Sequence, residues 1–145
     1  MTRFTGESIR IRGASRTDSG AHAEGQMVDF LTHTTHSLRK FGPALNYFLP
    51  EDIRVRAAYQ VTVDFSSRRN ALSRVYQYRI LNRKSPSALR RHTHFWVREW
   101  LDTELMAEAA GNLVGTHDFR MLASGHPLDK SAVRRVHRWD VTRHG

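Results

Sequence analysis

Apolar and polar side chains alternate along several short stretches of the chain, which is the pattern of β-strands with one buried face. Such strands are predicted at 9–12, 26–31, 53–63, 72–81 and 133–142, and a short apolar run predicts another at 95–97. In the strand at 26–31, Val28 and Phe30 fall on one side and are expected to share a face.

A helical repeat occurs at 103–114, preceded by Asp102 in the position of an N-cap and followed by Gly115 as the expected C-terminal stop. Apolar positions that recur every four residues predict a stripe facing the core, with two more apolar residues beside it: Leu105, Ala109 and Leu113, then Met106 and Ala110. A shorter helix is predicted at 43–48, because Pro43 suits a first helical turn and Pro50 would stop the helix.

The remaining segments lack periodicity. Residues 82–94 and 116–131 are expected to be irregular, and the polar, basic stretch 64–71 is the expected internal boundary. This order of strands and helices is compatible with an α/β (α+β) fold.

Composition narrows the class of protein. With 145 residues and 39% hydrophobic side chains the chain can bury a core, and it has no apolar run of about 20 residues for a membrane span. The first ten residues carry Arg3, Glu7 and Arg10 and do not look like a signal peptide. Cysteine is absent, which excludes disulfides and thiolate metal sites. A cytoplasmic protein is expected.

Charge points to a polyanionic partner. The chain has 23 basic against 14 acidic side chains, a net charge of +9, and all but three of the basic residues are arginines. The planar guanidinium suits bidentate contacts with phosphate and stacking on bases, so nucleic acid is the predicted partner. An arginine-rich composition without any ligand is the alternative.

The segment 13–22, with sequence GASRTDSGAH, combines the most reactive side chains with flexible backbone. Gly13 and Gly20 permit backbone angles closed to other residues. Arg16 lies two residues from Asp18, near enough to pair with it or to share a substrate, and a nearby arginine favours the ionised carboxylate that a nucleophile needs. The alternative is a surface turn in which Asp18 bonds its own backbone.

Histidines suggest a rival chemistry. His92 and His94 have a spacing seen at metal sites, and further histidines occur along the chain at His33, His36, His117 and His126. A metal-dependent hydrolase would be the competing enzyme class, although no set of histidines and carboxylates has a recognised ligand spacing.

The loop 13–22, with GQ at 25–26 and Phe30 after it, resembles the signature segment of the tRNA pseudouridine synthase A family. Other segments follow in that family's order: LN at 45–46, LPEDI at 49–53, DFSSR at 64–68, RVYQY at 74–78 and GTHDF at 115–119. Each piece alone is weak, and the ordered set is specific. The resemblance covers nearly the whole chain.

The family pattern also has an earlier strand and helix, and a later segment whose arginine pairs with the catalytic aspartate, and neither is found here. Region 38–49 is also shorter than usual. We therefore expect the chain to correspond to an internal part of such an enzyme. The implied fold is two ferredoxin-like halves around a mixed, mainly antiparallel sheet: residues 1–64 belong to the first half, 65–71 link the halves, and 72–145 belong to the second.

The resemblance implies isomerisation of uridine to pseudouridine in the anticodon arm of tRNA, without a cofactor or metal. It assigns the catalytic carboxylate to Asp18, which either attacks the substrate covalently or stabilises the cationic sugar. Tyr76 would stack on the target base, and Arg16 would hold the flipped nucleotide and its phosphate. Without the resemblance, Tyr76 reads as an ordinary strand aromatic.

His22, Arg68 and Arg74 are the other residues expected to contact substrate, His22 without acting as a general base. The family further implies a homodimer. The alternative is an RNA-binding segment without catalysis, and we expect the 145 residues alone not to turn over substrate.

Overall fold

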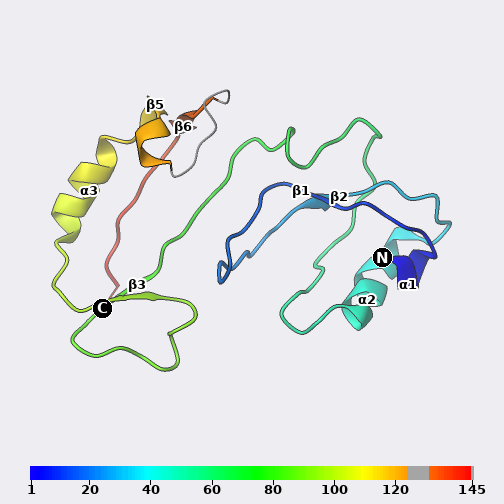
Figure 1. Cartoon of the computed structure of the whole chain (residues 1–145), viewed down its shortest axis with the longest axis horizontal. Coiled ribbons are helices and arrows are strands. Elements are labelled where there is room, and N and C mark those ends of the chain that lie inside the picture. The colour runs from blue at the N-terminus through cyan, green and yellow to red at the C-terminus, as the bar shows by residue number, and fades with distance from the viewer. Residues whose placement is uncertain (124–130, 145) are drawn as a thin grey trace. The chain divides into compact units, whose positions relative to one another are not determined.

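A computed structural model describes residues 1–123 and 131–144, and every structural statement below concerns these residues. They form two compact units, Met1–Gln77 and Tyr78–Gly145, which are described separately. The class is mixed α/β, as predicted, and the described strands pair into three two-stranded sheets (Figure 1). No described helix has the length and apolarity to cross a membrane.

The first unit is organised around a small aromatic core. Its elements are α1 (Thr2–Thr5), β1 (Arg12–Gly13), β2 (Val28–Asp29) and α2 (Leu38–Phe48). Phe41 on α2 is only 4% exposed, and the rings of Phe4 and Phe30 lie 5.1 and 6.1 Å from its ring. The short α1, which the sequence pattern did not predict, carries Phe4 into this core.

Helix α2 is longer than predicted. It begins at Leu38 rather than at residue 43, so Pro43 lies inside the helix and not in its first turn. Proline has no N–H, and the hydrogen bond that residue 43 would donate to the carbonyl of Arg39 is therefore lost. The predicted end was correct, since Leu49 caps the helix and its N–H donates to the carbonyl of Leu45 (2.9 Å).

Strands β1 and β2 form an antiparallel pair with Arg12 opposite Asp29 and Gly13 opposite Val28. Both are much shorter than the predicted strands at 9–12 and 26–31. Asp29 is buried while Val28 is 49% exposed, although Phe30, predicted on the same face as Val28, packs on Phe41. Burial of Asp29 is possible because its carboxylate accepts hydrogen bonds, as shown below.

The predicted strand at 53–63 and most of the one at 72–81 do not form. A strand requires a neighbour to take up its backbone groups, and no described strand pairs with these segments. At Val55 a side chain replaces that neighbour: Asn46 of α2 donates to the carbonyl of Val55 (3.0 Å) and accepts from its N–H (2.6 Å). The alternation of apolar and polar residues at 53–63 was therefore present without the strand pairing that normally accompanies such a pattern.

The second unit begins with a parallel pair, β3 (Ile80–Asn82) and β4 (Phe95–Val97). It continues through α3 (Thr103–Gly111), β5 (Gly115–Asp118), the 3-10 turn η1 (Arg120–Leu122) and β6 (Val133–Val136). Strands β5 and β6 are antiparallel, so part of the region expected to be irregular is a strand. Strand β4 was predicted correctly, and β6 is the first part of the strand predicted at 133–142.

Helix α3 confirms the predicted N-cap, because the carboxylate of Asp102 accepts from the N–H groups of Glu104 (2.9 Å) and Leu105 (3.1 Å). The predicted core stripe is confirmed in part. Ala110 is buried and Met106 and Leu113 are half-buried, whereas Leu105 is 63% exposed and Ala109 is exposed. The helix also ends earlier, at Gly111, and Gly115 opens β5 with a φ of +117° instead of closing the helix.

Candidate active site

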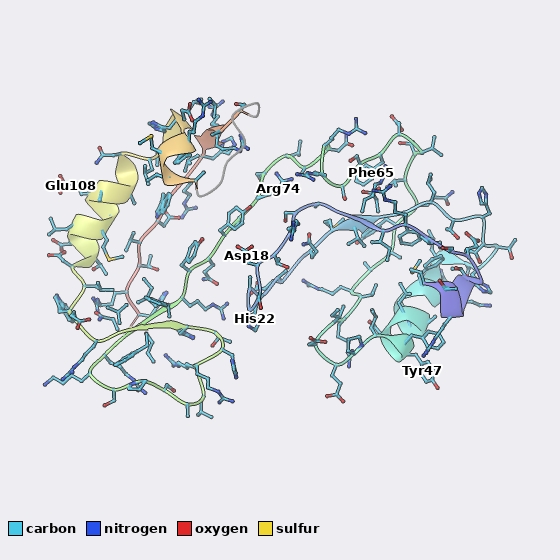
Figure 2. All side chains as sticks on the ribbon, in the orientation of Figure 1. Asp18, His22, Tyr47, Phe65, Arg74 and Glu108 are labelled. Carbon is cyan, nitrogen blue, oxygen red and sulfur yellow. The ribbon has the colours of Figure 1, made fainter. Side chains whose placement is uncertain are left out.

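The loop between β1 and β2, residues 14–27, carries Arg16, Asp18 and His22. Figure 2 labels Asp18 and His22 on this loop. At its centre the backbone turns tightly, because the N–H of Ala21 donates to the carbonyl of Asp18 (2.9 Å). Gly20 occupies the third position of this turn with a φ of +81°, which other residues rarely adopt. The expectation for Gly20 is confirmed, whereas Gly13 does not have a positive φ.

Asp18 presents its carboxylate outward from this turn. The side chain is exposed and forms no hydrogen bond or ion pair with any residue that the structure describes. The turn is closed by the backbone carbonyl of Asp18. The carboxylate of Asp18 makes no bond to the nearby backbone among the described residues. Arg16 makes no ion pair with it, which leaves both side chains open to a ligand.

Hydrogen bonds hold the base of the loop, one formed within the loop and others donated by a residue outside it. Within the loop, Gln26 donates from Nε2 to the carbonyl of Ser15 (2.8 Å). Arg74 donates from one Nη2 atom to the carbonyls of Ala14 and Arg68, at 3.2 Å each. Arg74 was predicted to contact substrate, and the structure places its guanidinium against the loop's backbone.

Asp29, next to the base of the loop, is a buried carboxylate with three donors. One oxygen, Oδ1, accepts from the N–H (2.9 Å) and the hydroxyl (2.6 Å) of Ser67, and the other, Oδ2, accepts from Nε of Arg12 (2.7 Å). These bonds join β1, β2 and the segment 66–69. The donors from Ser67, and then the Arg12 guanidinium, hold the pKa of Asp29 below its ordinary value of 3.8.

Two of the predicted substrate contacts, Arg16 and Arg68, line a common hollow of about 380 Å³. We call it the arginine hollow, and its lining contains three further arginines: Arg10, Arg12 and Arg69. Ser15 and Ser66 contribute hydroxyl groups, and no acidic residue belongs to the lining.

Tyr76 is 72% exposed and makes no hydrogen bond or ring contact with other described residues. Its ring is therefore accessible to a base, although the structure records no contact that joins it to Asp18. His22 lies on the same loop as Asp18, also exposed.

Histidines do not gather around a common point in the described part of the chain. No group of three or more His, Asp or Glu side chains there is arranged to hold a metal ion. His126, one of the residues of the rival interpretation, lies outside the described residues. The metal-dependent hydrolase gains no support.

Sequence reasoning missed Asp29, Ser67, Arg10 and Arg69. One signal was available for Asp29, since a carboxylate interrupts the otherwise apolar run at 27–31 and a polar group in such a run needs a partner. For Arg10 and Arg69 nothing local distinguishes them from the other arginines, because only the fold brings these two segments together.

Comparison with known proteins shows extended similarity. The chain is 46% identical, over 98% of its length, to "tRNA pseudouridine synthase A" of Sinorhizobium fredii. It is 47% identical over 98% of its length to the protein of that name in Agrobacterium fabrum, and 42% identical over 92% to that in Acetivibrio thermocellus. The chain spans 54–59% of the length of these relatives. A scan against family models gave no match.

Proposed function

Because this chain belongs to the tRNA pseudouridine synthase A family and spans a little over half the length of its curated relatives, we propose that it carries the uridine-isomerising site of a tRNA pseudouridine synthase. The observation that carries the proposal is the exposed carboxylate of Asp18, unpartnered among the described residues, on a loop whose base is anchored. The substrate is a uridine in the anticodon arm of tRNA.

In the reaction, the C1′–N1 glycosidic bond of uridine breaks, the uracil turns, and C5 bonds to C1′. The C5 proton then leaves and N1 takes up a proton, so atoms and electrons balance without an added reactant. Asp18 acts at C1′, as a nucleophile or as the anion that stabilises the developing positive charge on the sugar. Either role requires an ionised carboxylate that substrate can reach.

The other predicted contacts receive roles that their positions permit. Tyr76 stacks on the target base with its exposed ring, and Arg16 holds the flipped nucleotide from the same loop as Asp18. His22 contacts the substrate from that loop, and Arg68 contacts the RNA backbone from the arginine hollow. Arg74 supports the loop, as its bonds to Ala14 and Arg68 show, and its charge adds to the attraction for RNA.

We place the site in a fold of two ferredoxin-like halves linked at 65–71, acting as a homodimer on tRNA in the cytoplasm. Residues 65–71 lie within the first compact unit, so the division between halves remains a prediction about the longer fold. Similarity to the tRNA pseudouridine synthases supports tRNA as the substrate.

One observation favours a second candidate, an RNA-binding segment that does not turn over substrate. No arginine pairs with Asp18 among the described residues, whereas the resemblance implies such a partner. The 145 residues alone are therefore expected to bind tRNA without isomerising it.

The test uses a chimaera in which this chain replaces the matching segment of the Agrobacterium fabrum relative. Release of tritium from tRNA labelled at uridine C5 is the readout, and circular dichroism establishes that the chimaera is folded. We expect the chimaera to release tritium and the 145-residue chain to bind tRNA without release. A folded chimaera that releases none would contradict the proposed function, and release by the chain alone would contradict the second candidate.

A further inference from the structure

The arginine hollow extends beyond the residues that the proposed chemistry uses. One side of the hollow is lined by Arg12 of β1 and by Arg10, which precedes this strand. Arg68 and Arg69 line it from the segment after residue 65. Ser15 and Arg16, at the start of the catalytic loop, complete the lining. The hollow is thus contiguous with the loop that carries Asp18, two residues from Arg16.

The positive charge of this hollow is largely uncompensated. Arg12 is paired with Asp29, which lies 8% exposed behind it. Among the described residues, no carboxylate pairs with Arg10, Arg16, Arg68 or Arg69. Like charges gathered around one small space repel each other, and an anion that enters the space is attracted by all of them.

The chemistry of the lining selects the anion. Guanidinium groups bind phosphate oxygens with two parallel hydrogen bonds, and serine hydroxyls can donate further ones. A second hollow, of about 430 Å³ and lined by α1 and α2, contains only one charged side chain, Arg3, and offers no such set. Of these two hollows, the arginine hollow is the one that combines clustered cations with residues of the loop that carries Asp18.

We propose that the arginine hollow binds a backbone phosphate of the RNA next to the target uridine, with Arg10 and Arg69 as its dedicated ligands. This inference rests on the proposed function and deepens it. A phosphate held there fixes the strand while the uridine leaves its stack, and Arg16 links the held backbone to the flipped nucleotide. The Asp29 carboxylate, by pairing with Arg12 and with Ser67, keeps the two walls of the hollow together.

The first experiment measures binding of tRNA to the 145-residue chain as a function of salt. Arg10→Gln and Arg69→Gln should each weaken binding about fivefold to tenfold at 0.1 M salt and lower the slope of log Kd against log salt by about 0.7–0.9. Arg39→Gln is the matched control, since Arg39 is exposed on α2, has no partner among the described residues and lies outside the hollow. Arg39→Gln removes the same charge, and it should change the affinity for tRNA and the salt slope much less than Arg10→Gln or Arg69→Gln does.

The second experiment locates the phosphate. In an anticodon-arm RNA, single phosphodiesters around the target uridine are replaced by neutral methylphosphonates. At one linkage, the neutral methylphosphonate should weaken binding of the RNA to the wild type. It should not weaken binding to Arg69→Gln, because this variant has already lost the contact with that phosphate. Arg69→Lys should keep the salt slope and recover only part of the affinity, since lysine lacks the bidentate fork.

The results of these experiments distinguish the phosphate site from the proposed function. If wild type binds tRNA but Arg10→Gln and Arg69→Gln behave like Arg39→Gln, the hollow is not a phosphate site and the proposed function stands. Saturable binding of inorganic phosphate below millimolar concentration, with no effect of the methylphosphonates, would make it a site for a free anion and overturn the proposal. Failure of the wild-type chain to bind any tRNA would contradict the phosphate site, whereas the proposed function is tested separately by tritium release from the chimaera. Circular dichroism of each variant separates lost contacts from lost folding.

Discussion

Asp29 connects the strand pair that flanks the Asp18 loop to the segment 66–69 through a buried carboxylate. Its three donors come from Ser67 and Arg12, and they satisfy a charge that would otherwise be costly to bury. Replacing one partner leaves the other groups unsatisfied. The position of β1 relative to the segment 66–69, and with it the width of the arginine hollow, therefore depends on a single side chain.

Asp29→Asn should lower the stability of the chain at neutral pH, because the amide loses the ion pair with Arg12. The folded-state pKa of Asp29 lies below its ordinary value of 3.8, so its stabilising effect is present above that value and is lost as pH falls through the folded pKa. Urea midpoints should accordingly differ at pH 7 and converge below about pH 4.

Asp52→Asn serves as the control for this measurement, since Asp52 is exposed and makes no interaction with other described residues. Its midpoint should follow wild type at every pH. A constant difference between wild type and Asp29→Asn down to pH 2 would contradict the assigned ionisation.

Arg74 supports the loop through backbone carbonyls, so Arg74→Gln should loosen the loop without unfolding the unit. Loss of two exposed hydrogen bonds from a charged donor, worth about 1 kcal/mol together, predicts roughly fivefold faster cleavage of the loop. A protease specific for glutamate reports this at Glu24, which is exposed on the same loop, because exposed loops are cleaved faster as they become more mobile. Unchanged cleavage relative to Arg39→Gln would show that Arg74 does not anchor the loop.

Among the elements, α2 contributes the side chain that organises the following segment. Asn46 takes up both backbone groups of Val55 and so acts as a one-residue strand partner for a stretch that has no strand beside it. The helix thereby fixes the path of the chain from residue 50 towards Arg56, whose guanidinium donates to the carbonyl of Glu24 in the loop that carries Asp18 (3.0 Å).

Asn46→Ala should destabilise the chain by about 1–2 kcal/mol, because Val55 loses two hydrogen bonds and part of its backbone is desolvated. Alanine is the better helix former, so the loss cannot come from the helix itself. Asn46→Asp keeps the acceptor and should cost less. Equal urea midpoints for wild type and Asn46→Ala would contradict this role.

The elements that sequence predicted best are those defined by local signals. The N-cap at Asp102, the short strand at 95–97 and the end of α2 before Pro50 depend on residues close in sequence. The strands at 53–63 and 72–81 were overpredicted because alternation reports a preference, and pairing depends on a partner elsewhere in the fold. For the same reason α1, which is held by packing of Phe4 on Phe41, gave no local signal.

For the molecule as a whole, the family was accessible from sequence, and the comparisons confirm it. The net charge of +9 predicted a polyanionic partner but did not indicate where one would bind. That required the fold, because Arg10 and Arg69 are distant in sequence and line one hollow only when Asp29 holds Ser67 near β1. The roles assigned to individual side chains remain predictions for experiment.

The most direct measurement compares Asp18→Asn with Asp52→Asn in the chimaera, using release of C5 tritium from tRNA together with binding of the same tRNA. Both substitutions remove one exposed carboxylate, so only position distinguishes them. We expect Asp18→Asn to bind tRNA normally and to lose turnover by at least about a thousandfold, as expected for loss of a nucleophile, while Asp52→Asn retains it. Normal tritium release by Asp18→Asn would contradict the assignment of Asp18 as the reacting carboxylate.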